Sequence, residues 1–173
     1  MRLGRSFYEQ DVLIVAPDLI GKVLVLRHEG ITAFYTITEV EAYRGTEDQA
    51  SHARFGRTAR NSVMFRNGGL IYMYLIYGMY WMINIVTAPE GVPQAVLIRG
   101  LSGISGPGKV TKTLGLDKSF YGEDLVTSDR IWIEDSGQKP QYICKPRFGI
   151  NYAGEPWISN PWRYIMVQPP QIS

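Results

Sequence analysis

The sequence predicts an α+β fold: a single mixed domain with a curved antiparallel sheet, peripheral helices and a protruding β-hairpin. Length and composition give the first support, because 173 residues with 45% hydrophobic and 20% charged residues are typical of one globular domain. The pattern of residues gives the second, because segments rich in β-branched and aromatic residues lie between turn signals and few segments show the period of a helix. Residues 1–173 are therefore expected to form one domain.

Strands are expected where β-branched and aromatic residues lie between turn signals. The turn at 28–30, with the sequence His-Glu-Gly, separates two expected strands at 19–27 and 31–43. Three further strands are expected at 94–101 (QAVLIRGL), 130–135 (RIWIED) and 162–168 (WRYIMVQ).

The segment from Asn67 to Pro89 carries no charge and is long enough to raise the question of a membrane span. Its tyrosines lie in the middle, whereas a membrane span keeps aromatic residues at its two ends. The aromatic and β-branched residues on either side of Gly78 instead predict two strands joined by a tight turn, with Tyr77 and Met79 at the tip. No membrane partner is therefore expected.

Helical patterns are few and short. One covers 7–20, where Pro17 is compatible only with a break or a fresh start of the helix. A short helix is expected at 47–54, after the turn at Gly45. Another is expected to begin at Pro107, because proline suits the first turn of a helix.

Cysteine and histidine are too scarce for several classes of site. One cysteine excludes an internal disulfide and any multi-cysteine zinc or iron–sulfur centre, and two histidines argue against a histidine-built metal centre. No metal is expected. The N-terminus has no apolar signal-peptide core, so we expect an intracellular, reducing compartment.

The net charge of +2 conceals an uneven distribution. Residues 49–116 contain seven basic residues and a single acid, Glu90, while the rest of the chain is net negative. Such asymmetry indicates a basic face for a polyanion, although a solvated basic surface without a partner would look the same. Together with the aromatic residues, it favours nucleic acid.

Two carboxylates and a group of aromatic residues are candidates for chemistry. Glu39 and Glu41 lie two residues apart on one strand, so they share a face, and Glu41 is nearer the strand end. A carboxylate among aromatic neighbours can activate water as a general base, but this fragment alone favours an exposed glutamate. His52 by itself is more typical of a surface or core residue than of a catalytic one.

The aromatic residues suggest two uses on nucleic acid. An exposed Tyr77 and Met79 at a hairpin tip would suit a wedge between stacked bases. Tyr43, His52 and Tyr74 would offer flat faces for an unstacked base. Core filling is the alternative, and it must hold for most tyrosines of the hairpin.

Five blocks, taken in order, closely resemble the alkyladenine (3-methyladenine) DNA glycosylase family. The resemblance covers about residues 7–167, and the Glu-Ala-Tyr block with a histidine eleven residues after Glu41 is among its specific motifs. The blocks are TEVEAYRGTEDQASHA, GLIYMYLIYGMYWMIN, QAVLIRGL, GPGKVTKTLGLDKSFYGEDL, and RFGINYAGE with PWRYIMV.

The resemblance implies a monofunctional glycosylase of base excision repair. Such an enzyme flips a damaged purine (alkylated adenine, hypoxanthine or ethenoadenine) out of double-stranded DNA, hydrolyses its N-glycosidic bond and leaves an abasic site. Glu41 would be the general base and Arg99 would help hold the water and the carboxylate. Glu39 lies outside the carried-over motif, so we expect it to matter much less.

The resemblance also assigns the residues that contact the DNA. Tyr43 and His52 would stack on one face of the base and Tyr74 on the other, with the His52 backbone amide reading its edge. Asn84 at the pocket floor would penalise the exocyclic amine of guanine. The remaining implied roles are pocket lining by Ala50 and Leu97, a wedge formed by Tyr77 with Met79 beside it, and phosphate contacts by Arg57, Arg60 and Lys109.

No cofactor and no obligate protein partner are implied, so we expect a monomer acting on the chromosomal DNA. One departure from the family is the short segment 100–105, where the family usually carries a longer insertion. Two alternatives stay open. A non-enzymatic single-stranded nucleic-acid binding module would use the same composition without needing Glu41. An enzyme acting on a free nucleoside or a small formyl-type substrate would make the basic region incidental.

Overall fold

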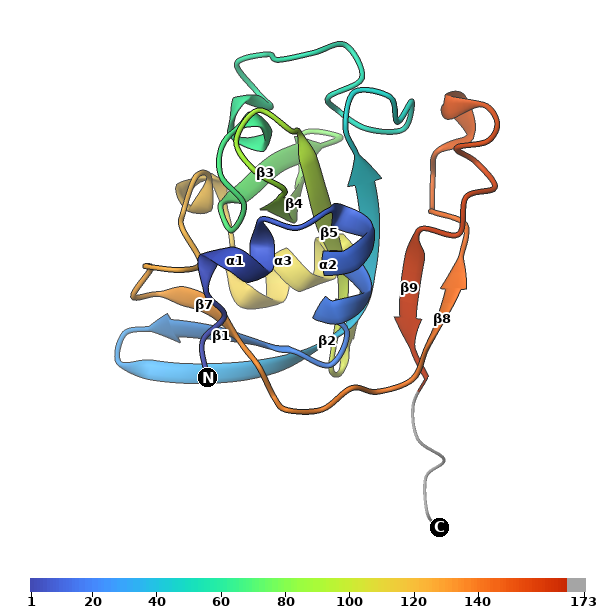
Figure 1. Cartoon of the computed structure of the whole chain (residues 1–173). Coiled ribbons are helices and arrows are strands. Elements are labelled where there is room, and N and C mark those ends of the chain that lie inside the picture. The colour runs from blue at the N-terminus through green and yellow to red at the C-terminus, as the bar shows by residue number, and fades with distance from the viewer. Residues whose placement is uncertain (168–173) are drawn as a thin grey trace.

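A computed structural model describes residues 1–167 and shows one antiparallel sheet of nine strands with helices at its edges (Figure 1). The strands follow the order β3-β4-β5-β2-β1-β7, with β6 beside β5 and the β8–β9 pair attached to β2. Their bounds are β1 Val23–His28, β2 Ile31–Arg44, β3 Ile71–Ile76, β4 Tyr80–Thr87, β5 Gln94–Leu101, β6 Ile104–Ser105, β7 Ile131–Glu134, β8 Tyr142–Lys145 and β9 Arg163–Met166. The α+β prediction is confirmed.

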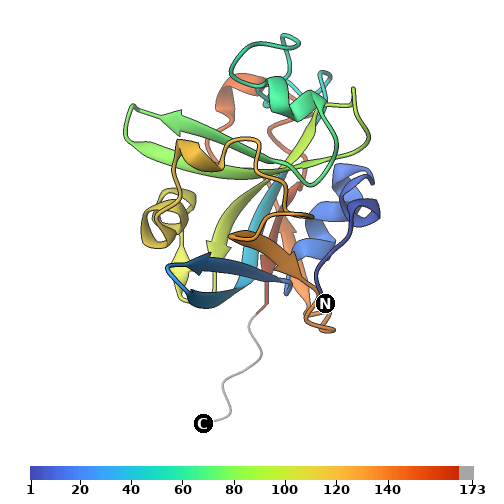
Figure 2. The ribbon, with the colours of Figure 1, turned by 90° about the vertical axis from the view of Figure 1, so that its left-hand side faces the viewer.

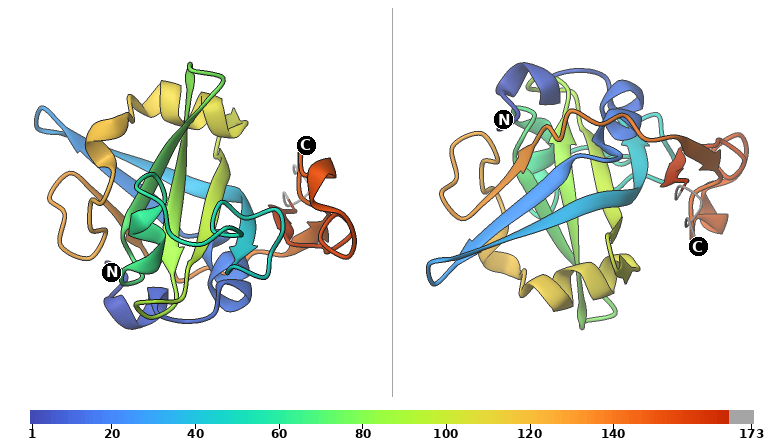
Figure 3. Two further views of the ribbon diagram at one scale, coloured as in Figure 1. Left: turned by 90° about the horizontal axis from the view of Figure 1, so that it is seen from above. Right: turned by 90° about the horizontal axis from the view of Figure 1, so that it is seen from below.

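The long strand β2 lets the sheet curve and cross itself. Its first half pairs with β1, and its second half pairs with β5 on one side and β9 on the other. The register with β5 shifts between Ile37 and Val40, which marks a bulge where the strand bends. Seen from below, β1, β2 and β7 cross the strands β3, β4 and β5 (Figure 3).

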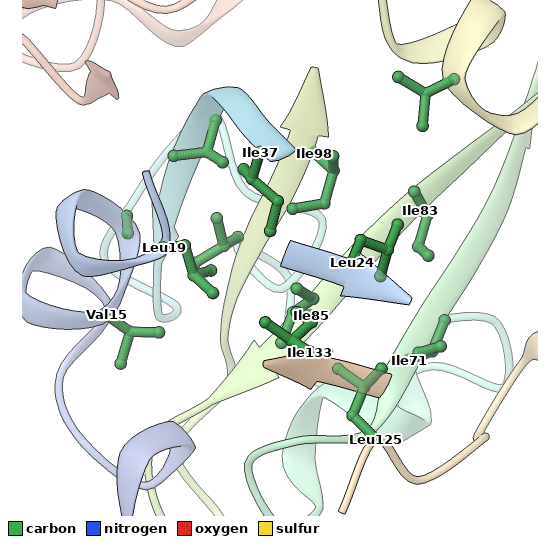
Figure 4. Packing of buried hydrophobic residues seen from close by; sticks show 14 of the residues in the cluster. Val15, Leu19, Leu24, Ile37, Ile71, Ile83, Ile85, Ile98, Leu125 and Ile133 are labelled. Atoms are coloured by element: carbon green, nitrogen blue, oxygen red, sulfur yellow. The ribbon is translucent and has the colours of Figure 1, made fainter. Parts of the chain in front are cut away.

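The hydrophobic core fills the space enclosed by this curved sheet. Branched side chains from β1 and β7 face those of β3, β4 and β5, as Leu24, Ile71, Ile85 and Ile133 illustrate (Figure 4). The helices are α1 Arg5–Tyr8, α2 Val12–Leu19 and α3 Pro107–Leu114, with 3₁₀ turns η1 Ser62–Phe65, η2 Lys118–Phe120 and η3 Asn151–Ala153. The pair α1–α2 and α3 lie at opposite sides of the sheet (Figure 2).

The N-terminal helix differs from its prediction in two ways. It divides at residues 9–11, because the Asp11 carboxylate accepts a hydrogen bond from the Leu13 N–H at 2.9 Å and caps a new helix. Pro17 then lies inside α2 and does not break it, since the helix ends only two residues later. The expected strand at 19–27 accordingly begins at Val23, after the turn at Gly21.

The helix expected at 47–54 is wrong, because this segment forms consecutive turns. The Asp48 carboxylate accepts hydrogen bonds from the backbone N–H groups of Arg44 (2.9 Å) and Ala50 (3.0 Å). An aspartate that bonds its own backbone in this way competes with helix formation. The helix beginning at Pro107 and the other expected strands are confirmed, although Gln168 lies outside the described residues.

The uncharged segment forms the predicted β3–β4 hairpin, which projects from the body of the protein (Figure 3, left). Tyr77 and Gly78 both have a positive φ, at +51° and +66°, and the Met79 N–H bonds the Ile76 carbonyl. The left-handed turn leaves the Tyr77 side chain 88% exposed and Met79 64% exposed. None of the helices in residues 1–167 has the length and apolarity needed to cross a membrane.

Replacing Tyr77 with serine should change the free energy of unfolding by no more than about 0.5 kcal/mol, as is usual for an exposed side chain. Either residue must adopt the same left-handed backbone conformation at this position. Leu24→Ala, which truncates a core side chain that is 1% exposed, should lose about 2–5 kcal/mol. Urea unfolding of both variants measures this, and a loss at Tyr77 comparable to that at Leu24 would contradict its placement.

Candidate active site

A cavity of about 570 Å³ opens where the C-terminal part of β2 and the strands β3, β4 and β5 meet two irregular segments. These are the loop after β2 and the segment between β8 and β9. This volume lies within the range of ordinary ligand sites. All eight residues expected to act in catalysis or base binding line it: Glu41, Tyr43, Ala50, His52, Tyr74, Asn84, Leu97 and Arg99.

Strand register explains why residues so distant in sequence meet here. Glu41 pairs with Leu97, Leu97 with Asn84, and Asn84 with Tyr72, which forms one row across four strands. Neighbouring strands in a sheet lie about 4.8 Å apart, and directly paired residues share a face. The general-base candidate and the pocket-floor candidate therefore lie on one wall, two strands apart, with Leu97 between them.

The Glu41 carboxylate is fully buried and has partners on both oxygens. Its Oε1 accepts a hydrogen bond from the Tyr43 hydroxyl at 3.0 Å, and its Oε2 accepts one from the Phe148 N–H at 2.5 Å. The Arg99 Nη1 lies 3.8 Å from Oε1. Burial raises the pKa of Glu41, while Arg99 and the two hydrogen bonds oppose this rise.

Glu39 has a larger place in the site than its sequence context predicted. Its Oε1 accepts hydrogen bonds from the Arg99 Nε and the Arg163 Nη1, each at 3.2 Å. Glu39 and Glu41 thus both lie within ion-pair distance of the Arg99 guanidinium, from the same face of β2. Glu39 fixes the orientation of Arg99, and the sequence carried no motif that would indicate this bond.

Three aromatic residues, His52, Tyr72 and Tyr74, contact one another along the cavity wall. The ring centroids of His52 and Tyr74 are 4.3 Å apart at an interplanar angle of 59°, and His52 Nδ1 lies 2.9 Å from the Tyr72 hydroxyl. A base cannot fit between His52 and Tyr74 at this separation, because stacking on both faces needs about twice one ring contact distance. Burial, with Arg60 and Arg54 nearby, lowers the pKa of His52 to about 4, so the imidazole is neutral at pH 7.

The segment between β8 and β9 supplies the wall that element prediction missed. Phe148, Ile150 and Tyr152 line the cavity, and the Tyr152 hydroxyl bonds the Ala50 carbonyl at 2.9 Å. This segment lies beside the end of β2 (Figure 1). Its only signal in the sequence was the block RFGINYAGE, which carries no periodicity.

Of the five residues expected to form the wedge or to contact phosphates, two line the cavity. Tyr77 and Arg60 line it, and the Arg60 Nη2 bonds the Leu75 carbonyl at 2.8 Å. Met79, Arg57 and Lys109 do not line it. Among residues 1–167 no group of three histidine, cysteine or acidic side chains is placed to hold a metal ion.

The α3 helix reaches the hairpin through a close contact. A Cβ on Gly108 would lie 3.2 Å from the Tyr80 side chain, so glycine allows the first turn of α3 to rest against the hairpin close to its tip. Lys109 follows directly and is exposed. The first turn of α3 is thereby placed beside the strand that leads from the exposed tip.

Known proteins resemble this chain along nearly its whole length. A family model described as methylpurine-DNA glycosylase (MPG) matches residues 6–105 and 102–170, two pieces that meet at the short β5–β6 turn. Relatives assigned provisionally as 3-methyladenine DNA glycosylases include one from Wolbachia pipientis wMel, which is 45% identical over 170 residues, or 94% of this chain and 89% of the relative.

Two further relatives with the same provisional assignment come from other organisms. The protein from Desulfitobacterium hafniense (strain Y51) is 40% identical over 99% of this chain and 98% of its own length. The protein from Methanocella arvoryzae is 38% identical over 99% and 95%. With the family model spanning most of the sequence and relatives aligned along nearly its whole length, the chain belongs to the methylpurine-DNA glycosylase family of hydrolytic DNA N-glycosylases.

Proposed function

We propose that this protein is a base-excision-repair glycosylase that draws a damaged purine out of duplex DNA and hydrolyses its N-glycosidic bond with water activated by Glu41. The observation that carries the proposal is a fully buried carboxylate in the wall of an aromatic cavity of about 570 Å³, beside an arginine. A non-enzymatic binder of single strands would have no use for such a carboxylate.

Base extrusion comes first, because the C1′ atom under attack is hidden inside the duplex. Extrusion costs a few kcal/mol, and less for a damaged base that pairs weakly. Tyr77 stands at the exposed tip of the hairpin and also lines the cavity mouth, so it can fill the emptied stack while the base enters. Arg57, Arg60 and Lys109 contact phosphates in this proposal, which the salt dependence of duplex binding tests.

Base recognition then depends on the aromatic walls. Tyr43 and His52 lie against one face of the base and Tyr74 against the other, which requires the touching rings of His52 and Tyr74 to separate on binding. Electron-rich aromatic faces favour cationic alkylated purines. Asn84 is buried, with its Nδ2 donating to the Tyr72 carbonyl at 3.3 Å, and in this proposal it forms the pocket floor that penalises the exocyclic amine of guanine.

Hydrolysis of the N-glycosidic bond follows. The water oxygen bonds to C1′ and gives its proton to Glu41, while the C1′–N bond breaks and its electron pair goes to the purine. A cationic alkylated purine leaves neutral, whereas hypoxanthine needs a proton. Arg99 holds the water beside the carboxylate, and ionised Glu41 stabilises the positive charge that develops on the sugar.

A duplex with a single hypoxanthine, and another with a single alkylated adenine, test the proposed function. The DNA is incubated with the protein, treated with alkali or left untreated, and run on a denaturing gel. A break that appears only after alkali supports hydrolysis to an intact abasic site, in keeping with the lack of a lysine along the cavity wall in residues 1–167. No break with either lesion contradicts the proposal.

Glu41→Gln should reduce excision by about a hundredfold or more, because the amide keeps the shape but cannot take a proton from water. Binding to the lesion duplex should be largely retained. Glu39→Gln is the matched control on the same strand face. It keeps an oxygen for Arg99, so its loss should be much smaller. Single-turnover excision by Glu41→Gln near the wild-type rate would overturn the assignment.

Excision should fall as the pH drops through the pKa of Glu41, because the base must be ionised. Burial raises this pKa, so the acidic limb should lie above the ordinary glutamate range. His52 adds no inflection near 6.5, since its pKa is lowered to about 4. A pH–rate profile with an alkylated purine measures this. A limb that persists in Glu41→Gln and vanishes in His52→Asn would disprove the prediction.

Tyr77→Ser should lower excision from duplex about ten- to a hundredfold, because the extruded state loses stacking of roughly 1–3 kcal/mol. Excision of the same lesion from single-stranded DNA should be unchanged, since that substrate has no stack to fill. Met79→Ser is the neighbouring control, with a smaller expected effect. Equal losses on single and double strands would show that Tyr77 is not a wedge.

A further inference from the structure

Asp48 and Arg147 form an ion pair that has no solvent exposure on either side chain. It is bidentate, with Nη1 2.6 Å from one carboxylate oxygen and Nη2 2.9 Å from the other. The pair joins the loop after β2 to the segment between β8 and β9. Neither residue lines the cavity.

Stability alone does not account for such a pair. Moving two charges out of water carries a large desolvation cost, and packed hydrophobic residues often replace a buried ion pair without loss. The Arg147 Nε is also buried without a hydrogen-bond partner among residues 1–167. An arrangement that is costly and incompletely satisfied points to a requirement for position.

Arg147 is linked through neighbouring residues to both oxygens of the Glu41 carboxylate. Its Nη1 bonds the carbonyl of Ala42 at 3.0 Å, and its guanidinium lies 4.8 Å from the ring centroid of Tyr43. Tyr43 donates to one Glu41 oxygen, and Phe148, the residue after Arg147, donates to the other. One donor, the Tyr43 hydroxyl, therefore belongs to a side chain that Arg147 contacts. The other, the Phe148 N–H, belongs to the residue that follows Arg147 in the chain.

We propose that Arg147, through its ion pair with Asp48, is a positioning residue that holds the two hydrogen-bond donors of Glu41 in place and so orients this carboxylate toward the attacking water. The inference rests on the proposed function. Arg147 itself touches neither DNA nor water in this role. It acts through Tyr43 and Phe148.

Several groups face Glu41 and set its ionisation together. Arg99 reaches it from β5, and Tyr74 faces it from β3. From the other side come Tyr43 on β2 and, in the segment between β8 and β9, Arg147, Tyr152 and the Phe148 amide. Loss of the two donated hydrogen bonds leaves the buried carboxylate with fewer interactions that favour its charged form.

Two variants separate position from stability. Arg147→Lys keeps the charge but loses the bidentate geometry and the planar contact with Tyr43. The double variant Asp48→Asn with Arg147→Met removes both charges and leaves no unpaired ion, which limits the risk of unfolding. Single-turnover excision of an alkylated purine from duplex is measured per folded molecule across pH.

Both variants should excise about ten- to a hundredfold more slowly, with duplex affinity largely unchanged and the acidic limb about one pH unit higher. Arg5→Lys is the matched control. Its partner Asp124 lies 2.5 Å away, and this pair also joins distant segments but lies outside the cavity wall. Arg5→Lys should lower the melting temperature without moving the rate or the limb.

A titration of the Glu41 carboxyl by carbon-13 NMR in the free protein, assigned with Glu41→Gln, decides the inference independently of activity. The Glu41 pKa should rise in Arg147→Lys relative to the wild type. An unchanged pKa overturns the role of Arg147, as does a double variant with the wild-type rate and limb. If the wild type excises no base, the proposed function fails and the titration still decides the role of Arg147.

Discussion

An ionised carboxylate removed from water is the constraint around which this site is built. Glu41 has no solvent exposure, and a charge in that position is unfavourable unless donors and cations replace its hydration. The replacements come from separate parts of the chain: Tyr43 from the same strand, Arg99 from β5 and the Phe148 amide from beyond β8. The carboxylate therefore has its full set of partners only when all three parts have folded together. Glu39 belongs to the same scheme, because it orients Arg99.

The secondary structure could be predicted to a large extent because its signals are local. Runs of β-branched and aromatic residues between turn signals predicted β5 and the β3–β4 hairpin, and Pro107 predicted the start of α3. The errors have a common cause. The Asp48 carboxylate turned an expected helix into turns, and the cap at Asp11 divided another helix. A short polar side chain that bonds nearby backbone overrides propensity, and composition does not reveal which backbone groups it meets.

The site was predictable in its residues and less so in its construction. The resemblance named the eight residues that meet at the cavity, yet the row from Glu41 to Tyr72 is a matter of strand register, which no local pattern specifies. Periodicity also gave no indication of the wall formed by Phe148, Ile150 and Tyr152, because an irregular segment has none. The contact between His52 and Tyr74 depends on tertiary packing, which no local pattern specifies.

The wall that completes the cavity lies late in the chain, between β8 and β9, and β9 is attached to the sheet only through β2 and β8. A ribosome makes the chain from its N-terminus. The aromatic wall residues of β2 and β3 and the exposed Tyr77 are therefore synthesised well before Phe148. During that interval Glu41 lacks the amide that completes its environment. Assembly during synthesis is therefore sequential: the hairpin can form first, and the surroundings of Glu41 are complete only after the segment between β8 and β9 has packed against β2.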